Sequence, residues 1–192
     1  GALGAAQTVA ELPLPGRLSK KHTSGPYRGQ EEGSTPDIIS HYSSPMGWLE
    51  LRGYGKVLSG VKCMRPPRVY AAPSKHFKGL FDRYFGGKPG TNRIRFELNG
   101  TAFQKRVWRE LQRVPWGQRI SYSELARRAG FPKAVRAVAG AVGRNPVAVL
   151  IPCHRVISAD GSLGGYAYGP RKKAWLIAHE KRYNPKFSGK RT

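Results

Sequence analysis

Three segments of the chain carry apolar residues at the three- and four-residue spacing of an amphipathic helix. They cover residues 74–85, the stretch that starts at residue 101, and residues 170–179. Their apolar positions are, in chain order, Phe77, Leu80, Phe81, Tyr84, Phe103, Val107, Leu111, Trp175, Leu176 and Ala178. Thr101 and Gln104 form a capping box, which fixes the start of the second helix. We therefore predict three helices, separated by the breakers Gly86, Gly87 and Pro89 and by polar segments.

Two shorter helices are predicted between the second and the third of these. Ser121 and Glu124 form another capping box, and Gly130 ends the helix that it opens. Pro132 then precedes the run KAVRAVAGAVG over residues 133–143. Two short helices joined by a turn that contains glycine resemble a helix-turn-helix.

The second helix of this pair has two different faces. Val135, Val138 and Val142 are suited to pack inward, while the other face carries Arg136, Ala139, Gly140 and Gly143. This face holds almost nothing that reads base edges in the major groove. Small residues around one arginine suit close approach to a narrow groove and insertion into the base stack. Ordinary helix packing through alanine and glycine, with Arg136 as a solvent-exposed charge, is the alternative.

Alternating and short apolar runs predict strands elsewhere. Residues 41–63 alternate around Trp48, Leu49 and Leu51 and turn at Gly53 and Gly55, which predicts a β-hairpin. A short strand is predicted at residues 94–98, and another, buried, at residues 147–151. The predicted fold class is α/β: a small N-terminal α/β lobe over residues 38–99, and a helical C-terminal domain over residues 100–184.

The two ends of the chain lack such patterns. Residues 1–37 are rich in glycine, serine, proline and lysine, which is typical of a flexible arm, and residues 185–192 form a basic tail. No window approaches the roughly eighteen apolar residues of a membrane span, and the start shows no signal-peptide pattern. We therefore expect an intracellular protein without a membrane partner, in the nucleus if eukaryotic and in the cytoplasm if prokaryotic.

The charge balance points to a polyanionic partner. The chain carries 34 lysines and arginines against 11 acidic residues, a net charge of +23. Basic and acidic residues cancel through Asp37, so the whole excess lies in the later part of the chain. Such an excess favours nucleic acid, through phosphate contacts and counterion release. A solubilising surface and a ribosome-type binder are the alternatives.

The chain has two cysteines, Cys63 and Cys153. Without a secretion signal and without a CxxC pair, neither a disulfide nor a structural zinc site is predicted. Cys63 ends an apolar run and is interpreted as a packed thiol. Cys153 follows Pro152 and precedes His154 and Arg155, a setting in which a neighbouring base and a cation can favour the nucleophilic thiolate. A buried structural cysteine remains the alternative.

The string Pro152-Cys153-His154-Arg155-Val156 resembles the acceptor motif of the O6-alkylguanine-DNA alkyltransferases, the methylated-DNA–protein-cysteine methyltransferases. The resemblance extends from about Phe103 to Glu180 and includes, in order, ISYSELA, RAV, RNPV, IPCHRV, a Gly-Tyr pair and AHE. The segment SSPMGWLEL also resembles the start of that family's first lobe. The resemblance implies an RNase H-like first lobe and a winged helix-turn-helix-like second lobe.

The family's catalytic roles carry over onto matching residues. Cys153 corresponds to the alkyl acceptor, His154 to the base that deprotonates it through a water, and Glu180 to the carboxylate that holds the histidine. Asn145 corresponds to the turn between recognition helix and active-site segment. Tyr122 corresponds to the tyrosine that helps rotate the nucleotide out and protonates the leaving guanine at N3.

The resemblance also implies how DNA is bound. Arg136 corresponds to the arginine that fills the gap in the duplex, and the other implied DNA-binding residues are Tyr122, Ala134, Ala137, Gly140 and Arg144. The base pocket is implied at Val156, Tyr166 and Ala167, where Ala167 departs from the serine of some members. Some members bind zinc in the first lobe, but with Cys63 alone available we expect neither a metal nor a cofactor.

The implied activity is direct-reversal repair of double-stranded DNA by a monomer. An alkyl group moves irreversibly from O6 of a flipped-out guanine to Cys153, with O4-alkylthymine as a second candidate substrate, and each molecule acts once. One rival is a non-catalytic binder that marks alkylated bases, against which the intact Cys153, His154 and Glu180 argue. The other is a transcription regulator that senses methylation, which would need a further DNA-reading module.

Overall fold

A computed structural model describes residues 37–88 and 94–184, all within the unit Thr35–Thr192. The predicted basic tail and, apart from Asp37, the predicted N-terminal arm lie outside the described residues. We refer to residues 37–98 as the sheet half and to residues 101–184 as the helical half. No helix in the described part of the chain is both long and apolar enough to cross a membrane.

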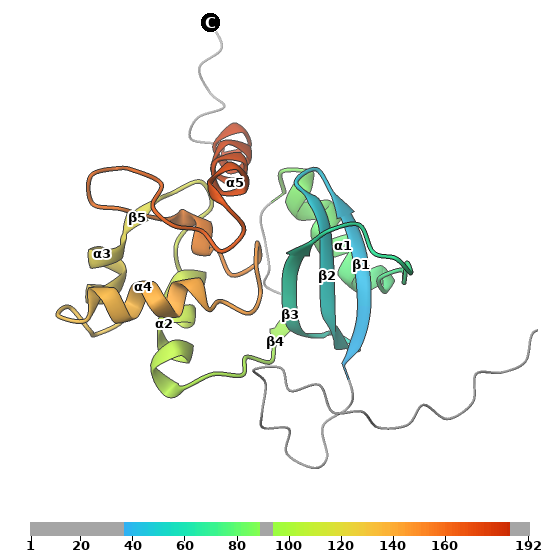
Figure 1. Ribbon diagram of the computed structural model, residues 1–192, viewed down its shortest axis with the longest axis horizontal. Coiled ribbons are helices and arrows are strands. Elements are labelled where there is room, and N and C mark those ends of the chain that lie inside the picture. The colour runs from blue at the N-terminus through green and yellow to red at the C-terminus, as the bar shows by residue number, and fades with distance from the viewer. Residues whose placement is uncertain (1–36, 89–93, 185–192) are drawn as a thin grey trace, which may run out of the picture. The chain divides into compact units, whose positions relative to one another are not determined.

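The sheet half is built on a four-stranded sheet in the order β1-β2-β3-β4 (Figure 1). Strands β1 (Ile38–Ser44), β2 (Gly47–Tyr54) and β3 (Val57–Met64) are antiparallel, and the short β4 (Arg95–Phe96) pairs in parallel with β3. The predicted hairpin is confirmed as β2 and β3, with its turn at Gly55. Gly53, which was also predicted at the turn, lies in β2 and pairs with Leu58. The prediction missed a second hairpin, formed by β1 and β2. A two-residue turn joins these strands just before Gly47, whose φ is +107°.

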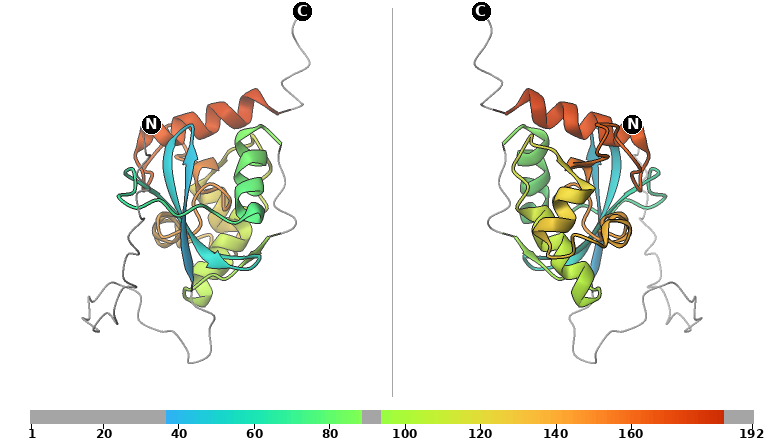
Figure 2. Two further views of the ribbon diagram at one scale, coloured as in Figure 1. Left: turned by 90° about the vertical axis from the view of Figure 1, so that its right-hand side faces the viewer. Right: turned by 90° about the vertical axis from the view of Figure 1, so that its left-hand side faces the viewer.

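Helix α1 (Lys75–Phe85) lies along one face of this sheet (Figures 1 and 2). Its N-cap is Ser74, whose hydroxyl accepts a hydrogen bond from the backbone N–H of Phe77. As predicted, Phe77, Phe81 and Tyr84 are buried on one face. The ring of Phe81 lies 5.2 Å from that of Tyr42 on β1, so aromatic packing fixes the helix against the sheet.

The helical half contains α2 (Ala102–Gln112), α3 (Tyr122–Arg128), α4 (Val135–Gly143) and α5 (Pro170–Arg182). Both predicted capping residues accept hydrogen bonds at their helix starts, Thr101 from Gln104 and Ser121 from Glu124. Gly130 ends the α3 segment at φ +84°, a conformation that favours glycine. The indole N–H of Trp108 on α2 donates to a carbonyl of α4 at 2.8 Å, which ties the two helices together.

The predicted strand over residues 147–151 is wrong: this segment is a buried turn. Val149 has φ 73°, and the N–H of Ile151 donates to the carbonyl of Val147 within the segment. Only Val147 forms a bridge, to Val61 of β3. An apolar run of five residues is buried either way, and here the segment satisfies much of its own backbone hydrogen bonding instead of joining a sheet.

The last helix differs from its prediction in length and in its inner face. It continues to Arg182, and Ala178, predicted as an apolar contact, is exposed. The inner face carries Leu176 together with the buried polar residues Lys173, His179 and Glu180. Buried polar groups require partners, so this face is where a functional site is expected.

Candidate active site

Cys153 opens a single 3-10 turn (Cys153–Arg155) that leads into β6 (Val156–Ile157), the parallel partner of β5 (Ile120–Ser121). Its side chain is 6% exposed, and its sulfur accepts a hydrogen bond from Asn145 Nδ2 at 3.1 Å. Burial raises the pKa of Cys153, while the Asn145 hydrogen bond and the charge of Lys173 lower it in part. The thiol form is therefore favoured at rest, and proton transfer to a base must accompany nucleophilic attack.

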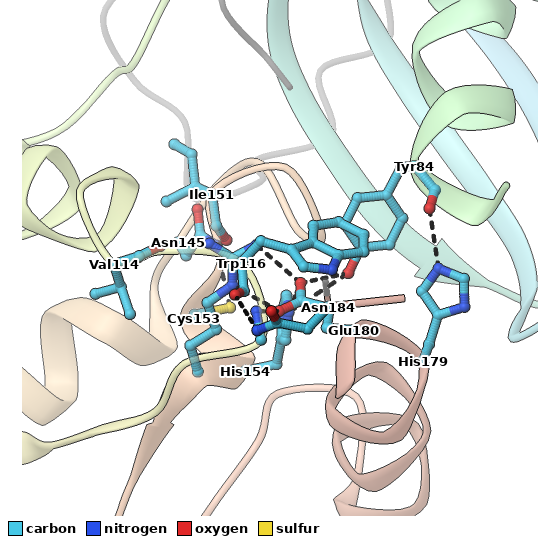
Figure 3. Close-up of polar contacts among 12 residues, drawn as sticks. Tyr84, Val114, Trp116, Asn145, Ile151, Cys153, His154, His179, Glu180 and Asn184 are labelled. Atoms are coloured by element: carbon cyan, nitrogen blue, oxygen red, sulfur yellow. Dashed lines mark hydrogen bonds and ion pairs between the residues drawn. The ribbon is translucent and has the colours of Figure 1, made fainter. Parts of the chain in front are cut away.

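Asn145 holds the turn that presents this thiol and also contacts the sulfur directly (Figure 3). Its Nδ2 donates to the carbonyl of Ile151 at 2.8 Å, and its Oδ1 accepts from the N–H of Val147 at 3.0 Å. One amide side chain thus closes the segment between α4 and Cys153. This side chain replaces the backbone pairing that a strand would have supplied.

His154 and Glu180 form a fully buried pair, 2.7 Å apart between Nε2 and Oε1. Burial lowers the pKa of His154, and the carboxylate of Glu180 opposes this in part, so the imidazole is neutral at neutral pH. Because Nε2 donates its proton to the carboxylate, Nδ1 is left with its lone pair. No hydrogen bond to Nδ1 comes from the described residues, so this atom is free to accept a proton.

The Glu180 carboxylate is held from several sides (Figure 3). Arg155 binds both oxygens, Nε to Oε2 at 2.8 Å and Nη2 to Oε1 at 2.9 Å, and the N–H of Gly117 donates to Oε2 at 3.1 Å. Burial raises the pKa of Glu180, but His154 and Arg155 outweigh it and leave the pKa well below its ordinary range. Glu180 is therefore a fixed negative charge that can stabilise an imidazolium on His154.

Arg155 does not have the role that the sequence suggested. We expected its charge to favour the Cys153 thiolate, yet its guanidinium is committed to Glu180 and to the carbonyl of Val114. The cation that lowers the pKa of Cys153 is Lys173 instead. Arg155 is close to Cys153 in sequence but does not supply the positive charge near its sulfur, because the 3-10 turn directs successive side chains to different sides.

Sequence reasoning missed Lys173, whose side chain is fully buried on α5. Its ammonium donates to the carbonyls of Val156 at 2.6 Å, of Leu163 and of Gly165 at 3.3 Å, and lies 6.0 Å from the centre of the Tyr122 ring. Lys173 therefore ties α5 to the segment that contains the predicted pocket residues. The signal was present, since Lys173, Leu176 and Glu180 are spaced as one helical face.

Replacing Lys173 with methionine is expected to destabilise the fold by about 3 kcal/mol, because three carbonyls lose a charged donor inside the protein. The matched control is Lys172→Met, since the neighbouring lysine is half-buried and donates to a single carbonyl among the described residues, that of Met46 at 2.9 Å. Urea unfolding of both variants measures the difference. Equal losses of stability would show that Lys173 does not organise the segment.

The predicted pocket residues surround the same segment with different exposure. Val156 is buried, Tyr122 and Tyr166 are half-buried, and Ala167 is exposed. Burial raises the pKa of Tyr122, and the charge of Cys153 adds to this, so its hydroxyl stays protonated and can donate. A β-carbon on Gly164, at φ +63°, would lie 3.6 Å from the Tyr122 ring, which places this segment beside the tyrosine.

The predicted DNA-binding residues lie on and around α4. Arg136, Ala137 and Arg144 are exposed, and Ala134 and Gly140 are half-buried. A β-carbon on Gly143 would meet nothing within 4 Å, and one on Gly140 would meet only the end of the Arg144 side chain at 3.3 Å. Internal packing therefore does not require glycine at these two positions. This weakens the alternative in which the small residues serve helix packing.

Known proteins match this chain over both halves. The 6-O-methylguanine DNA methyltransferase DNA-binding domain matches residues 102–182. The methylated-DNA–protein-cysteine methyltransferase of Mycolicibacterium paratuberculosis is 41% identical over 150 residues, covering 74% of this chain and 91% of the relative. The chain belongs to the methylated-DNA–protein-cysteine methyltransferase family.

Solved structures of this methyltransferase family share the fold. Mycobacterium tuberculosis OGT, solved in complex with DNA, has a TM-score of 0.68 and 37% identity, covering 78% of this chain and 96% of that one. The O6-methylguanine-DNA methyltransferase of Pyrococcus kodakaraensis has a TM-score of 0.54 at 22% identity, covering 74% and 97%. The predicted α/β fold class is thereby confirmed. The matched domain contains Cys153, His154 and Glu180, so the buried cluster lies within the family's shared region.

Proposed function

We propose that this chain repairs DNA directly by transferring a methyl or other alkyl group from O6 of guanine to the sulfur of Cys153. The observation that carries the proposal is the buried cluster in which Cys153 is followed by a neutral His154 bound to an ionised Glu180. That arrangement supplies a nucleophile, a base and a fixed negative charge behind the base. The relatives that this chain matches are named methylated-DNA–protein-cysteine methyltransferases, and that name requires a cysteine as the acceptor.

The reaction follows from these groups. The thiol proton passes through a water molecule to Nδ1 of His154, and Glu180 stabilises the imidazolium that forms. The sulfur attacks the alkyl carbon, the bond between that carbon and O6 breaks, and its electrons return to the guanine ring. Tyr122 donates a proton to N3, so guanine leaves as a neutral base. The phenolate that this leaves is then reprotonated through solvent while the imidazolium of His154 loses its extra proton. The product is a thioether, which none of these groups can cleave, and each molecule therefore acts once.

DNA must open for this chemistry, since O6 lies in the major groove of a stacked base pair. An enzyme that acts on a single base takes the nucleotide out of the stack. The exposed face of α4 supports this step, because small residues allow close approach and Arg136 can enter the gap that the flipped nucleotide leaves. The basic excess supplies the phosphate contacts, and we propose that the protein binds double-stranded DNA as a monomer.

The substrate is tested with matched duplexes that contain O6-methylguanine, O4-methylthymine, N7-methylguanine or no lesion. We expect loss of the methyl group from O6-methylguanine, with O4-methylthymine as a second candidate. Persistence of the O6-methyl group would favour a protein that only marks lesions. We expect no strong preference for any undamaged sequence, because the face of α4 offers few groups that read bases. Such a preference would favour a transcription regulator.

Replacing Arg136 with alanine is expected to slow repair of a duplex by about tenfold or more, corresponding to at least ~1.4 kcal/mol of the unstacking cost. The free base O6-methylguanine needs no flipping, so its reaction should change little. Arg83→Ala on α1 is the control, since it removes an equal charge from the sheet half. Equal losses on duplex and free base would place Arg136 in the pocket or in the fold.

We propose that the chain is divided into two lobes at the predicted boundaries. Residues 38–99 form the first lobe, and residues 100–184 form the second, which binds DNA and carries the alkyl acceptor. The two short helices α3 and α4 then act as a helix-turn-helix. We further propose an intracellular location, the nucleus or the cytoplasm according to the cell type, because the substrate is cellular DNA.

A further inference from the structure

We propose that Tyr84, which the sheet half contributes from α1, is a positioning residue of the acceptor site: its hydroxyl holds the Glu180 carboxylate against His154. The inference rests on the proposed function and names a component of the site that lies outside the matched DNA-binding domain. Sequence reasoning assigned Tyr84 only to the apolar face of its helix.

The geometry places three polar atoms of the two halves together (Figure 3). The hydroxyl of Tyr84 donates to Glu180 Oε1 at 2.9 Å, and the same oxygen binds His154 Nε2 at 2.7 Å. The hydroxyl oxygen lies 3.4 Å from that Nε2. Tyr84 therefore contacts both members of the pair at the edge where they meet, and it restricts the rotation of each.

The position of this hydroxyl is itself fixed. The Tyr84 ring packs edge-on against Trp116 at 5.0 Å and against Phe85 at 5.1 Å. Its backbone carbonyl is 2.9 Å from Nε2 of His179, one residue before Glu180 on α5. Two contacts thus join the same turn of α5 to Tyr84, one through the backbone and one through the side chain.

Packing alone does not require a hydroxyl at this position. Phe77 and Phe81 fill the neighbouring positions on the same buried face of α1 without one. A buried hydroxyl costs free energy unless it forms a hydrogen bond, and that of Tyr84 is used on a carboxylate. Burial raises the pKa of Tyr84 well above its ordinary value, with the charge of Glu180 adding to the effect, so it remains a proton donor.

The hydroxyl also influences the proton affinity of His154. Charged and titratable groups approach this site from α1 (Tyr84), from the 3-10 turn (Cys153, Arg155), from α5 (Lys173, His179, Glu180) and from the pocket segment (Tyr166). Of these, Tyr84 and Arg155 share Oε1 of Glu180 with His154. Without the tyrosine donor, more of the negative charge at Oε1 acts on the imidazole, which raises its pKa. Since transfer needs the neutral base, the acid limb of the rate profile moves to higher pH.

The test is Tyr84→Phe in the full chain, with Tyr54→Phe as the matched control. Tyr54 also lies in the sheet half and donates to a carboxylate, that of Glu97 at 2.9 Å, away from the acceptor site. Single-turnover transfer from O6-methylguanine duplex is measured across pH. We expect transfer by Tyr84→Phe to be about tenfold slower near neutral pH, with the acid midpoint displaced upward, and we expect the control to match the wild type.

A second measurement tests the role of Tyr84 without relying on alkyl transfer. The titration of His154, followed by NMR in wild type and Tyr84→Phe, should move to higher pH in the variant. An unchanged titration would overturn the role of Tyr84, whether or not the protein repairs DNA. Slower transfer with reduced thermal stability and an unmoved midpoint would assign Tyr84 to packing alone. Absence of transfer in the wild type, with a shifted titration in the variant, would overturn the proposed function and leave the positioning role intact.

Discussion

Replacing Cys153 with alanine is expected to abolish alkyl transfer while leaving DNA binding close to that of the wild type. The substitution removes only a sulfur from a side chain that is 6% exposed, and the exposed face of α4 is unaltered. Transfer is measured as loss of the alkyl group from the duplex, and binding by titration of the same duplex at one fixed salt concentration.

The matched control for this variant is Cys63→Ala. Cys63 is a half-buried thiol on β3, and burial raises its pKa to about 11, which makes it a poor nucleophile at neutral pH. We expect this variant to transfer at the wild-type rate. Transfer by Cys153→Ala, or its loss in Cys63→Ala, would mean that the wrong cysteine has been assigned as acceptor.

Replacing Glu180 with glutamine is expected to slow transfer by roughly a hundredfold and to destabilise the fold by about 3–5 kcal/mol. His154 loses the charge that stabilises its protonated form, and the buried Arg155 loses its counter-charge. Single-turnover rates and urea unfolding measure the two effects separately. Glu110→Gln is the control, since Glu110 is also buried but pairs with an exposed arginine on the helix surface.

The same substitution should change how stability depends on pH. The pKa of Glu180 is lowered in the folded protein, so the carboxylate contributes stability that is fully present above the ordinary glutamate pKa of about 4.5. That contribution is lost as pH falls below 4.5 toward the folded value. The wild type should therefore lose stability through this acid range more steeply than Glu180→Gln. Parallel pH profiles would contradict the buried ion pair.

Local signals in the sequence were sufficient for most of the elements. The capping box at Thr101 and the N-cap at Ser121 place two helix starts correctly, because the groups that cap a helix are a few residues apart. The predicted second half of the Ser121 box is absent, since the Glu124 carboxylate binds Arg127 and Arg128. The string PCHRV predicted the acceptor cysteine and its base through its resemblance to a family motif, and these roles remain predictions. The prediction of a strand over residues 147–151 was wrong, because burial alone does not distinguish a strand from a turn with internal backbone hydrogen bonds.

Contacts between distant residues could not be read from the pattern. Tyr84 and Glu180 are 96 positions apart, and only the packing of α1 against α5 brings them together. Lys173 was overlooked because a lysine on a helix is ordinarily exposed, and two of its three carbonyl partners, Leu163 and Gly165, lie in an irregular segment. In both cases the residue serves the site through a buried hydrogen bond that spacing along the chain does not reveal.

The central claim is that Cys153 accepts one alkyl group and is then spent. Intact-protein mass with peptide mapping, after incubation with excess O6-methylguanine duplex, tests it most directly. We predict one methyl adduct per molecule, on the peptide that contains IPCHR, and no further repair when fresh substrate is added. An adduct on Cys63, an unmodified protein after repair, or several lesions repaired per molecule would contradict the account.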